Sequence, residues 1–304
     1  MSLKAELHCH NSFSNFHLGS GEPPYDCDVS IRDQLERARA LGLDAVFVTN
    51  HNTLDGYEQM LQYRNDHEKF AGIRVHPAEE VTTDRGAHVL AYGIREAIPS
   101  GTPLEEIVES VREQGGVSSA PHPFSLLDAL RDDAARCDMV EVFNSNNVDV
   151  LSNARAAQFA AEKNMVPVAG SDSHVLSTLG RCVNIIDSEN ALDDILHALR
   201  RGRTQICQAG YAMRDETLDH LRYKLNSSRE YVTEYMSEHY PRAKWFLRLL
   251  LRMYDLDQDN RMWGLIYRLC VCAMRRISRK VNFEGLDPQF MKQRNLGTMF
   301  YKAL

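Results

Sequence analysis

Short apolar runs alternate with amphipathic stretches over the first two thirds of the chain. Seven runs rich in Val, Ala and other apolar residues indicate β-strands, at residues 5–8, 45–49, 74–77, 89–92, 117–120, 139–143 and 166–169. Leu, Ala and Ile at helical spacing predict helices between several of them, at residues 31–41, 103–114, 151–163 and 192–201. Strands that alternate with helices pair in parallel through crossovers, so the pattern predicts an α/β fold, and the number of strands favours a barrel.

The pattern changes after residue 208, where residues 214–254 and 261–280 show helical spacing and Pro241 is expected to begin a new helix. We therefore expect a barrel at residues 1–207 and a mostly helical extension of unknown role at residues 208–304. The acidic segment between the two helical stretches lacks the Gly and Glu of a calcium loop, so it predicts a turn. The apolar stripe at residues 245–254 is expected to pack against the barrel or a second subunit rather than in a membrane, so an oligomer through the extension is conceivable.

Composition is that of a soluble globular protein, with 43% hydrophobic and 25% charged residues among 304. Acidic and histidine residues appear by position 8, which argues against a signal peptide, and arginines interrupt the longest apolar run. The seven cysteines are odd in number, are scattered and form no CxxC pair, as expected for free thiols in a reducing compartment. We therefore expect a cytoplasmic protein with no membrane partner and no thiolate zinc site.

Charge is unevenly distributed along the chain. Residues 208–304 hold 17 Lys and Arg against 11 Asp and Glu, a net charge of +6, which leaves −13 for residues 1–207. An acidic first part is expected if carboxylates and neutral histidines await divalent cations. The basic tail is compatible with an anionic partner, so nucleic acid is possible, but the charge is too modest to favour it.

Histidines and carboxylates stand at the ends of successive predicted strands: His8, His10, His51, Glu79, Glu80, His88, His122, Asp172 and His174. In parallel barrels the loops after the strands converge on one face, where function is built. Residues two apart in a strand point the same way, so His8 and His10 can hold one ion together. Imidazole and carboxylate ligands suit zinc, manganese or iron. Other histidines, such as His76 and His220, lack this strand-end setting.

Six motifs occur in the order of those of the PHP (polymerase and histidinol phosphatase) family, which the sequence resembles over residues 5–207. They are LHCHNSFSN (7–15), TNHNT (49–53), EEVTT (79–83), HVLAYG (88–93), APHP (120–123) and GSDSH (170–174). The resemblance implies a distorted seven-stranded (β/α)7 barrel, two or three divalent metal ions and phosphoester hydrolysis. The helical extension matches no family that we recognise.

Carried over position by position, the resemblance implies three groups of metal ligands. One ion would be held by His8, His10, Glu80 and Asp172, and Glu80 would bridge to a second ion held by His88 and His122. A third ion would take His51, His174 and one residue of the loop after His10. Glu80 is preferred to Glu79 because the family's glutamate is followed by a β-branched residue and then Ser or Thr.

Two positions depart from the family pattern. The first motif commonly ends in Ser-Asp, but here Asn15 follows Ser14, and the second commonly reads Thr-Asp-His, but here Asn50 precedes His51. Asparagine is neutral and a weaker oxygen ligand than aspartate. The third ion would therefore be held by Asn15 or by His17, or the site holds two ions only.

The expected activity is hydrolysis of a phosphoester, with a small phosphomonoester or a nucleotide as substrate. Two cations would lower the pKa of a shared water toward ~7 and neutralise the phosphate oxygens. Asp172 and His174 are catalytic candidates, with His174 or His17 as general acid if no third ion binds. Arg181 is a candidate for phosphate contact, and Asn144 is expected beside the ligands.

Two other functions compete with hydrolysis of a phosphoester. Because Asn15 and Asn50 stand where the family commonly has aspartate, the chain could instead be a catalytically degenerate metal-binding module with a regulatory or interaction role. A metal hydrolase acting on C–N bonds is less compatible, because no lysine stands at a strand end and because of the spacing of Glu80 and His88.

Overall fold

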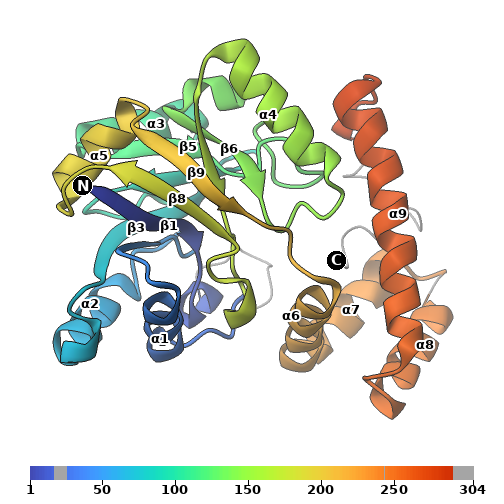
Figure 1. The fold of residues 1–304 in the computed structure, drawn as a ribbon. Coiled ribbons are helices and arrows are strands. Elements are labelled where there is room, and N and C mark those ends of the chain that lie inside the picture. The colour runs from blue at the N-terminus through green and yellow to red at the C-terminus, as the bar shows by residue number, and fades with distance from the viewer. Residues whose placement is uncertain (17–25, 243, 290–304) are drawn as a thin grey trace.

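The computed structural model describes residues 1–16, 26–242 and 244–289, and its strands form one nine-stranded sheet (Figure 1). The strands are β1 (Ser2–Cys9), β2 (Ala45–Val48), β3 (Arg74–Thr82), β4 (His88–Tyr92), β5 (Val117–Ala120), β6 (Met139–Asn144), β7 (Val166–Gly170), β8 (Cys182–Asp187) and β9 (Thr204–Ala209). Their order in the sheet is β7-β6-β5-β4-β3-β2-β1-β8-β9. Since β7 also contacts β1 and β9, the sheet curls into a nearly closed barrel.

All seven predicted strands form, but the predicted strand count and the all-parallel pairing are corrected. β8 and β9 are additional strands, and both pair antiparallel, β8 with β1 and β9 with β8. β4 is antiparallel to β3 and to β5, because the connection from β3 to β4 is far too short for a parallel crossover. β3 is also longer than predicted, so Glu79 and Glu80 lie within the strand rather than after it.

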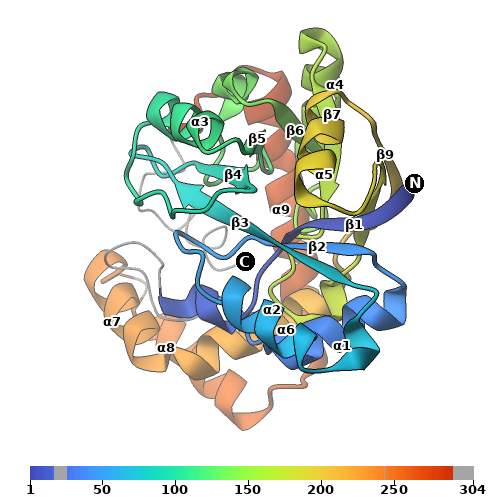
Figure 2. The ribbon, with the colours of Figure 1, turned by 90° about the vertical axis from the view of Figure 1, so that its left-hand side faces the viewer.

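Five helices cover the sheet: α1 (Ile31–Leu41), α2 (Tyr57–Asn65), α3 (Leu104–Glu113), α4 (Leu151–Lys163) and α5 (Leu192–Arg200) (Figure 2). Successive side chains of β2 point to opposite faces of the sheet, which separates two apolar cores. Val46 and Val48 pack with α1 and α2, whereas Phe47 joins Leu7 and the apolar side chains of α5. α2 was not predicted because its apolar residues follow no clear helical stripe.

Four helices follow β9: α6 (Arg214–Ser227), α7 (Arg229–His239), α8 (Lys244–Leu256) and α9 (Arg261–Phe283). The helical stretch predicted at residues 214–254, with a new helix expected at Pro241, is three helices: a break after Ser227 was not predicted, and the helix after Pro241 begins at Lys244. The acidic segment before Arg261 is a turn, as expected. α9 runs beside α4 (Figure 1). The stripe on α8 is only partly packed, since Leu247 is buried but Trp245 is 71% exposed. Among the described helices, none has the length and apolarity to cross a membrane.

Candidate metal centre

The ends of the strands bring most of the predicted ligands into one buried cup. Three groups of side chains there place their ligand atoms within 4.8 Å of one another. The groups are His8, His10, Glu80 and Asp172; His51, Glu80 and His88; and His10, Asp26, His51 and His174. Side chains from β1, β3 and β4 and from the loops after β1, β2 and β7 thus converge, as the position of the motifs led us to expect.

The first group is compact. The Nε2 atoms of His8 and His10 each lie 3.2 Å from Oε2 of Glu80. Both Nε2 atoms also lie 3.4 Å from Oδ1 of Asp172. Two imidazoles and two carboxylates thus face a single point, an arrangement that suits one divalent cation.

Glu80 links this group to the second. Its other oxygen, Oε1, lies 3.0 Å from Nδ1 of His88 and 3.1 Å from Nε2 of His122. The two carboxylate oxygens therefore face different sets of histidines, which is the geometry of a bridging ligand. His51 adds a third ring, with Nδ1 3.5 Å from Oε2 of Glu80.

The third group is completed by Asp26, a residue that the sequence did not single out. Its Oδ1 lies 3.1 Å from Nε2 of His174 and 3.8 Å from Nε2 of His51. Asp26 follows His10 by sixteen positions, in a loop without periodicity, so spacing gave no reason to choose it. The one available signal was that it is the first aspartate after His10.

The two asparagines that depart from the family pattern lie outside these groups. The side-chain oxygen of Asn15 accepts hydrogen bonds from the backbone N–H groups of Asp26 and Cys27. Asn50 accepts from the backbone N–H of Asn11 and donates to the side chain of Asn11. Asn15 thus shapes the loop that presents Asp26, whereas Asn50 ties the end of β2 to the end of β1. Asn50 needs its amide group for this, because a carboxylate cannot donate.

The charges in the cup depend strongly on one another. Burial alone would raise the pKa of Glu80, but His51 and His8 hold that pKa well below its ordinary range. Burial likewise opposes ionisation of Asp172, yet His8 beside it keeps its pKa low. Conversely, burial would lower the pKa of His10, but the Asp172 and Glu80 carboxylates raise it to about 9. These carboxylates therefore stay ionised only because positive charge lies next to them, and a metal ion supplies such charge.

Glu141 in β6 orients two of the candidate ligands. Its Oε1 accepts a hydrogen bond from Nδ1 of His8 at 2.8 Å, which directs Nε2 of His8 to the first group. Its Oε2 accepts from the backbone N–H of His122 at 3.0 Å. Gly170 makes room for it, since a Cβ atom there would lie 1.9 Å from the Glu141 carboxylate. A charge in an otherwise apolar strand was the signal that could have identified Glu141.

Asn144, expected beside the ligands, is there. It donates from Nδ2 to Oε2 of Glu141 at 3.0 Å and to Oδ2 of Asp172 at 3.2 Å. The backbone is strained at two candidate ligand residues, since φ is +30° at His122 and +48° at Asp172. Such conformations are costly for residues other than glycine and concentrate at functional sites.

Helix α6 of the extension contacts the loop that carries Asp26. Nε2 of His220 donates to the backbone carbonyl of Asp26 at 2.9 Å, and its ring stacks on that of His174 with centroids 5.0 Å apart. The Tyr223 hydroxyl donates to the carbonyl of Cys27 at 3.2 Å. The third group is therefore assembled from the barrel with support from the extension, a role that strand-end reasoning did not assign to His220.

Arg181 lies apart from the three groups. Its guanidinium forms an ion pair with Glu216 at the start of α6, 2.5 Å away, and so helps to fix the extension to the barrel. Its contact with a phosphate group stays a prediction. His17, the other predicted ligand of the third ion, lies outside the described residues.

Divalent cations fit the residues that are present. Each group offers imidazole and carboxylate donors in a buried setting, the donor set of zinc, manganese and iron sites. Oδ2 of Asp26 is buried and has no hydrogen-bond partner among the described residues. A buried carboxylate oxygen without a partner is costly unless a cation is bound to it.

The fold and the cup define a class: an α/β barrel with a candidate polynuclear metal centre at its strand ends. The family model described as PHP-associated matches residues 150–204. Uncharacterized protein MJ1587 of Methanocaldococcus jannaschii is 33% identical over 154 residues, which cover 50% of this chain and 87% of that protein.

Solved structures show the same fold. A two-domain protein from Bacteroides vulgatus, containing a predicted PHP-like metal-dependent phosphoesterase, matches with a TM-score of 0.54 at 19% identity, over 75% of this chain and 70% of that one. PsfC from Pseudomonas syringae matches with a TM-score of 0.50 at 16% identity, over 76% of this chain and 98% of that one. The chain belongs to the PHP family.

Proposed function

We propose that this protein hydrolyses a phosphoester, with two or three divalent cations (Mn, Zn or Fe) bound in the cup. The observation that carries the proposal is the convergence of three ligand groups that share Glu80, His10 and His51. Shared ligands place the cations next to one another, as phosphoester hydrolysis at a polynuclear site requires. When bound, the cations would supply Lewis acidity and activate water.

The hydrogen bonds of the ligands indicate which atom of each imidazole faces a cation. Nδ1 of His174 lies 2.9 Å from the carbonyl of Asp172, an acceptor only, so Nδ1 carries the proton and Nε2 faces Asp26. His8 is held in the same way, with its Nδ1 proton on Glu141. Both histidines thus keep Nδ1 on a fixed acceptor and turn Nε2 toward the cup, so a cation that replaces the Nε2 proton would meet rings already oriented for binding.

We assign the third ligand group to His51, His174 and Asp26, with His10 beside them. The carboxylate of Asp26 supplies the negative charge that the family pattern has at positions 15 and 50, where this chain has asparagine. The main reason to consider a degenerate module was the absence of a charged ligand there, and Asp26 removes that reason. Asp172 and His174 hold cations in this scheme, and Arg181 remains a candidate for contact with the substrate phosphate.

Burial of the ligands favours a small substrate or the end of a larger one. Side chains of His51, His88, His122 and His174 are only 10–15% exposed, and those of His8, His10 and Glu80 are at most 1% exposed. A terminal phosphate can reach such a site more easily than a bond in the middle of a polymer. We therefore propose a small phosphomonoester or a nucleotide as substrate.

Phosphate release from an aryl phosphate and from nucleotides tests the proposal, with chelated protein to which Mn²⁺ or Zn²⁺ is returned. Asp172→Asn and His122→Ala should each abolish metal-dependent turnover while the fold survives. Asp193→Asn and His197→Ala are matched controls, because both side chains are exposed on α5, away from the cup. Turnover that is equal with and without metal, or unchanged in Asp172→Asn, would refute the mechanism. A protein that binds metal but releases no phosphate from any substrate would support the regulatory alternative.

A further inference from the structure

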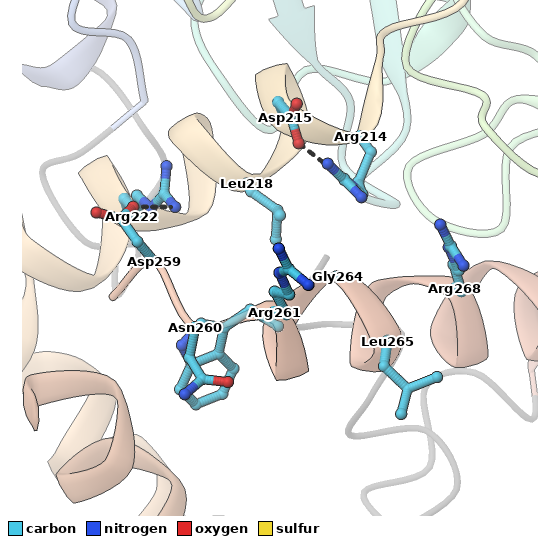
Figure 3. Close-up of a pocket in the computed structure, with 11 residues that line it drawn as sticks. Arg214, Asp215, Leu218, Arg222, Asp259, Asn260, Arg261, Gly264, Leu265 and Arg268 are labelled. Carbon is cyan, nitrogen blue, oxygen red and sulfur yellow. Dashed lines mark hydrogen bonds and ion pairs between the residues drawn. The ribbon is translucent and has the colours of Figure 1, made fainter. Parts of the chain in front are cut away.

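A cleft of about 430 Å³ lies between α6 and the first turns of α9, on the extension (Figure 3). Its volume falls within the range of small-molecule sites. The side of α6 that lines it carries Arg214, Leu218 and Arg222, whereas His220 on the same helix contacts the Asp26 loop. The cleft and the metal cup are thus reached from different faces of one helix.

Four arginines line the cleft, against two acidic residues, Asp215 and Asp259. Arg222 is neutralised, since its guanidinium pairs with Asp219 at 2.7 Å and with Asp259 at 2.9 Å. Arg214 pairs with its neighbour Asp215 through Nε, at 2.7 Å. The terminal nitrogens of Arg214 are left to face the cleft, where Nη1 approaches Gly264 of α9.

Arg261 and Arg268 carry the excess charge. Both are exposed, and neither forms an ion pair or a hydrogen bond within the described part of the chain. α9 contains no acidic residue, so no carboxylate on the helix can neutralise them. The two arginines are seven positions apart, which puts them on the same face with Cα atoms about 10 Å from each other. Figure 3 shows both side chains rising from α9 toward the side of the cleft where Arg214 lies.

Gly264 lies between these two arginines and keeps the cleft open. A Cβ atom there would lie 3.4 Å from Nη1 of Arg214, so a larger side chain would occupy the space in front of that guanidinium. Leu218 and Leu265 add apolar surface beside the charged groups. Three guanidinium groups around one space repel one another unless an anion lies between them.

We infer that this cleft is a binding site for a small ligand with a diphosphate group, separate from the metal cup. Guanidinium groups bind phosphate oxygens through paired, charge-assisted hydrogen bonds. Arg261 and Arg268 are far enough apart to contact two phosphate groups, and Arg214 approaches the same space from α6. The inference goes beyond the proposed hydrolysis, which needs none of these residues.

Calorimetric titration of inorganic pyrophosphate into Asp172→Asn protein tests this site. The substitution removes a metal ligand, so that pyrophosphate held in the cup contributes little to the signal. We expect saturable binding, weakened at least roughly tenfold when Arg261→Gln and Arg268→Gln are added, because each removes charge-assisted hydrogen bonds. Arg276→Gln with Arg279→Gln is the matched control: it removes the same charge from α9 at exposed positions outside the cleft, and the affinity should stay within roughly twofold.

The fluorescence of Trp263 gives a second measurement in a protein with an intact cup. The chain has two tryptophans, and Trp245→Phe leaves only Trp263, which lines the cleft. Its emission should change on addition of pyrophosphate, and change far less after the Arg261/Arg268 substitutions. ADP that competes with pyrophosphate would identify a nucleotide as a possible source of the diphosphate, whereas its failure to compete would favour the free anion.

Two results would overturn the inference. One is the absence of binding by both methods at millimolar pyrophosphate. The other is that the Arg276/Arg279 control substitutions weaken the binding of pyrophosphate as much as the Arg261/Arg268 substitutions do, and that both pairs also weaken the binding of a single-stranded oligonucleotide equally. That result would indicate diffuse attraction of polyanions to α9. Phosphate release by the wild-type protein reports on the cup alone, so the two proposals can fail separately.

Discussion

The barrel and the helical extension are built in different ways, although they meet at one site. In the barrel, large apolar side chains such as Phe47, Tyr92 and Phe159 are fully buried between sheet and helices. In the extension, α7 has no buried residue among those described, and Trp245 and Leu256 are 71% and 86% exposed. The barrel is therefore held by extensive apolar packing, whereas the extension has a small apolar contact of α9 with Leu126 and depends more on particular polar contacts.

Those contacts concentrate on two parts of the barrel. Near the cup, α6 is fixed by the Arg181–Glu216 ion pair and by the bonds of His220 and Tyr223. At the other end, Nδ2 of Asn282 in α9 donates to the carbonyl of Phe124 at 3.1 Å. Because the first set lies beside Asp26, the barrel alone positions two of the candidate ligand groups, and the third depends partly on the extension.

The largest effect is expected from Glu80→Gln, within the barrel. Glu80 contributes to two ligand groups, so the substitution removes a charge from both, and turnover should fall by roughly a thousandfold or more. Metal analysis of the purified variant should show fewer bound ions than in the wild type. Glu79→Gln is the matched control: Glu79 is the neighbour in β3, and its carboxylate accepts a bond from the backbone N–H of Ile98 instead. If Glu80→Gln retained all its metal, Glu80 would not be a bridging ligand.

A smaller effect is expected from His220→Leu, in the extension. The change removes the donor to the carbonyl of Asp26, so the affinity of the third ligand group should fall roughly tenfold to a hundredfold. The other two groups should keep their affinity, which competition with a graded chelator can resolve. His220→Gln retains a hydrogen-bond donor, so its metal affinity should lie between those of His220→Leu and the wild type. A purely structural defect at this position would not be relieved by a donor.

His239→Leu makes the same substitution on α7, where the ring packs against Tyr235 rather than against the Asp26 loop. Metal affinity should be unchanged in this control. If His239→Leu weakened the binding of metal as much as His220→Leu does, the extension would act through general stability alone. The distinction between the two regions would then lose its basis.

The same contrast explains what could be predicted from the sequence. Seven strands followed from local patterns, because a short apolar run is a property of a few neighbouring residues, and the histidines at the strand ends could then be marked as candidate ligands. β8 and β9 were missed: Cys182–Asp187 is apolar enough to form a strand but was not recognised, and Thr204–Ala209 is too polar and exposed to show an apolar run. Asp26 lies far from the strand-end motifs in sequence, His220 depends on the packing of a distant helix, and neither is encoded by spacing. Asn15 shows the converse, since its proximity in sequence to His10 suggested a ligand, while its side chain binds the backbone of Asp26 and Cys27 instead.

The smallest effect concerns the stability of the barrel as a function of pH. His76 in β3 is buried against Phe47, and burial, helped by Arg74, lowers its pKa to about 4. In the unfolded chain the pKa is near 6.5, so between pH 6.5 and 4 the unfolded state binds a proton that the folded state does not. Stability from this residue is thus complete above pH 6.5 and is lost as pH falls toward 4, by about 2 kcal/mol at pH 5.

Two variants, His76→Phe and His76→Gln, isolate this contribution, because neither side chain titrates. Denaturant unfolding with a chelator present would give the free energy of unfolding at pH 7.5 and at pH 5 without a contribution from bound metal. The wild type should lose about 2 kcal/mol more than either variant between the two values. The signal should be followed through the sheet, since β3 belongs to the barrel, and the helical signal of the extension should show no separate dependence on His76. An identical pH dependence in wild type and variants would mean that His76 is protonated in the folded barrel, and that its burial against Phe47 is incomplete in solution.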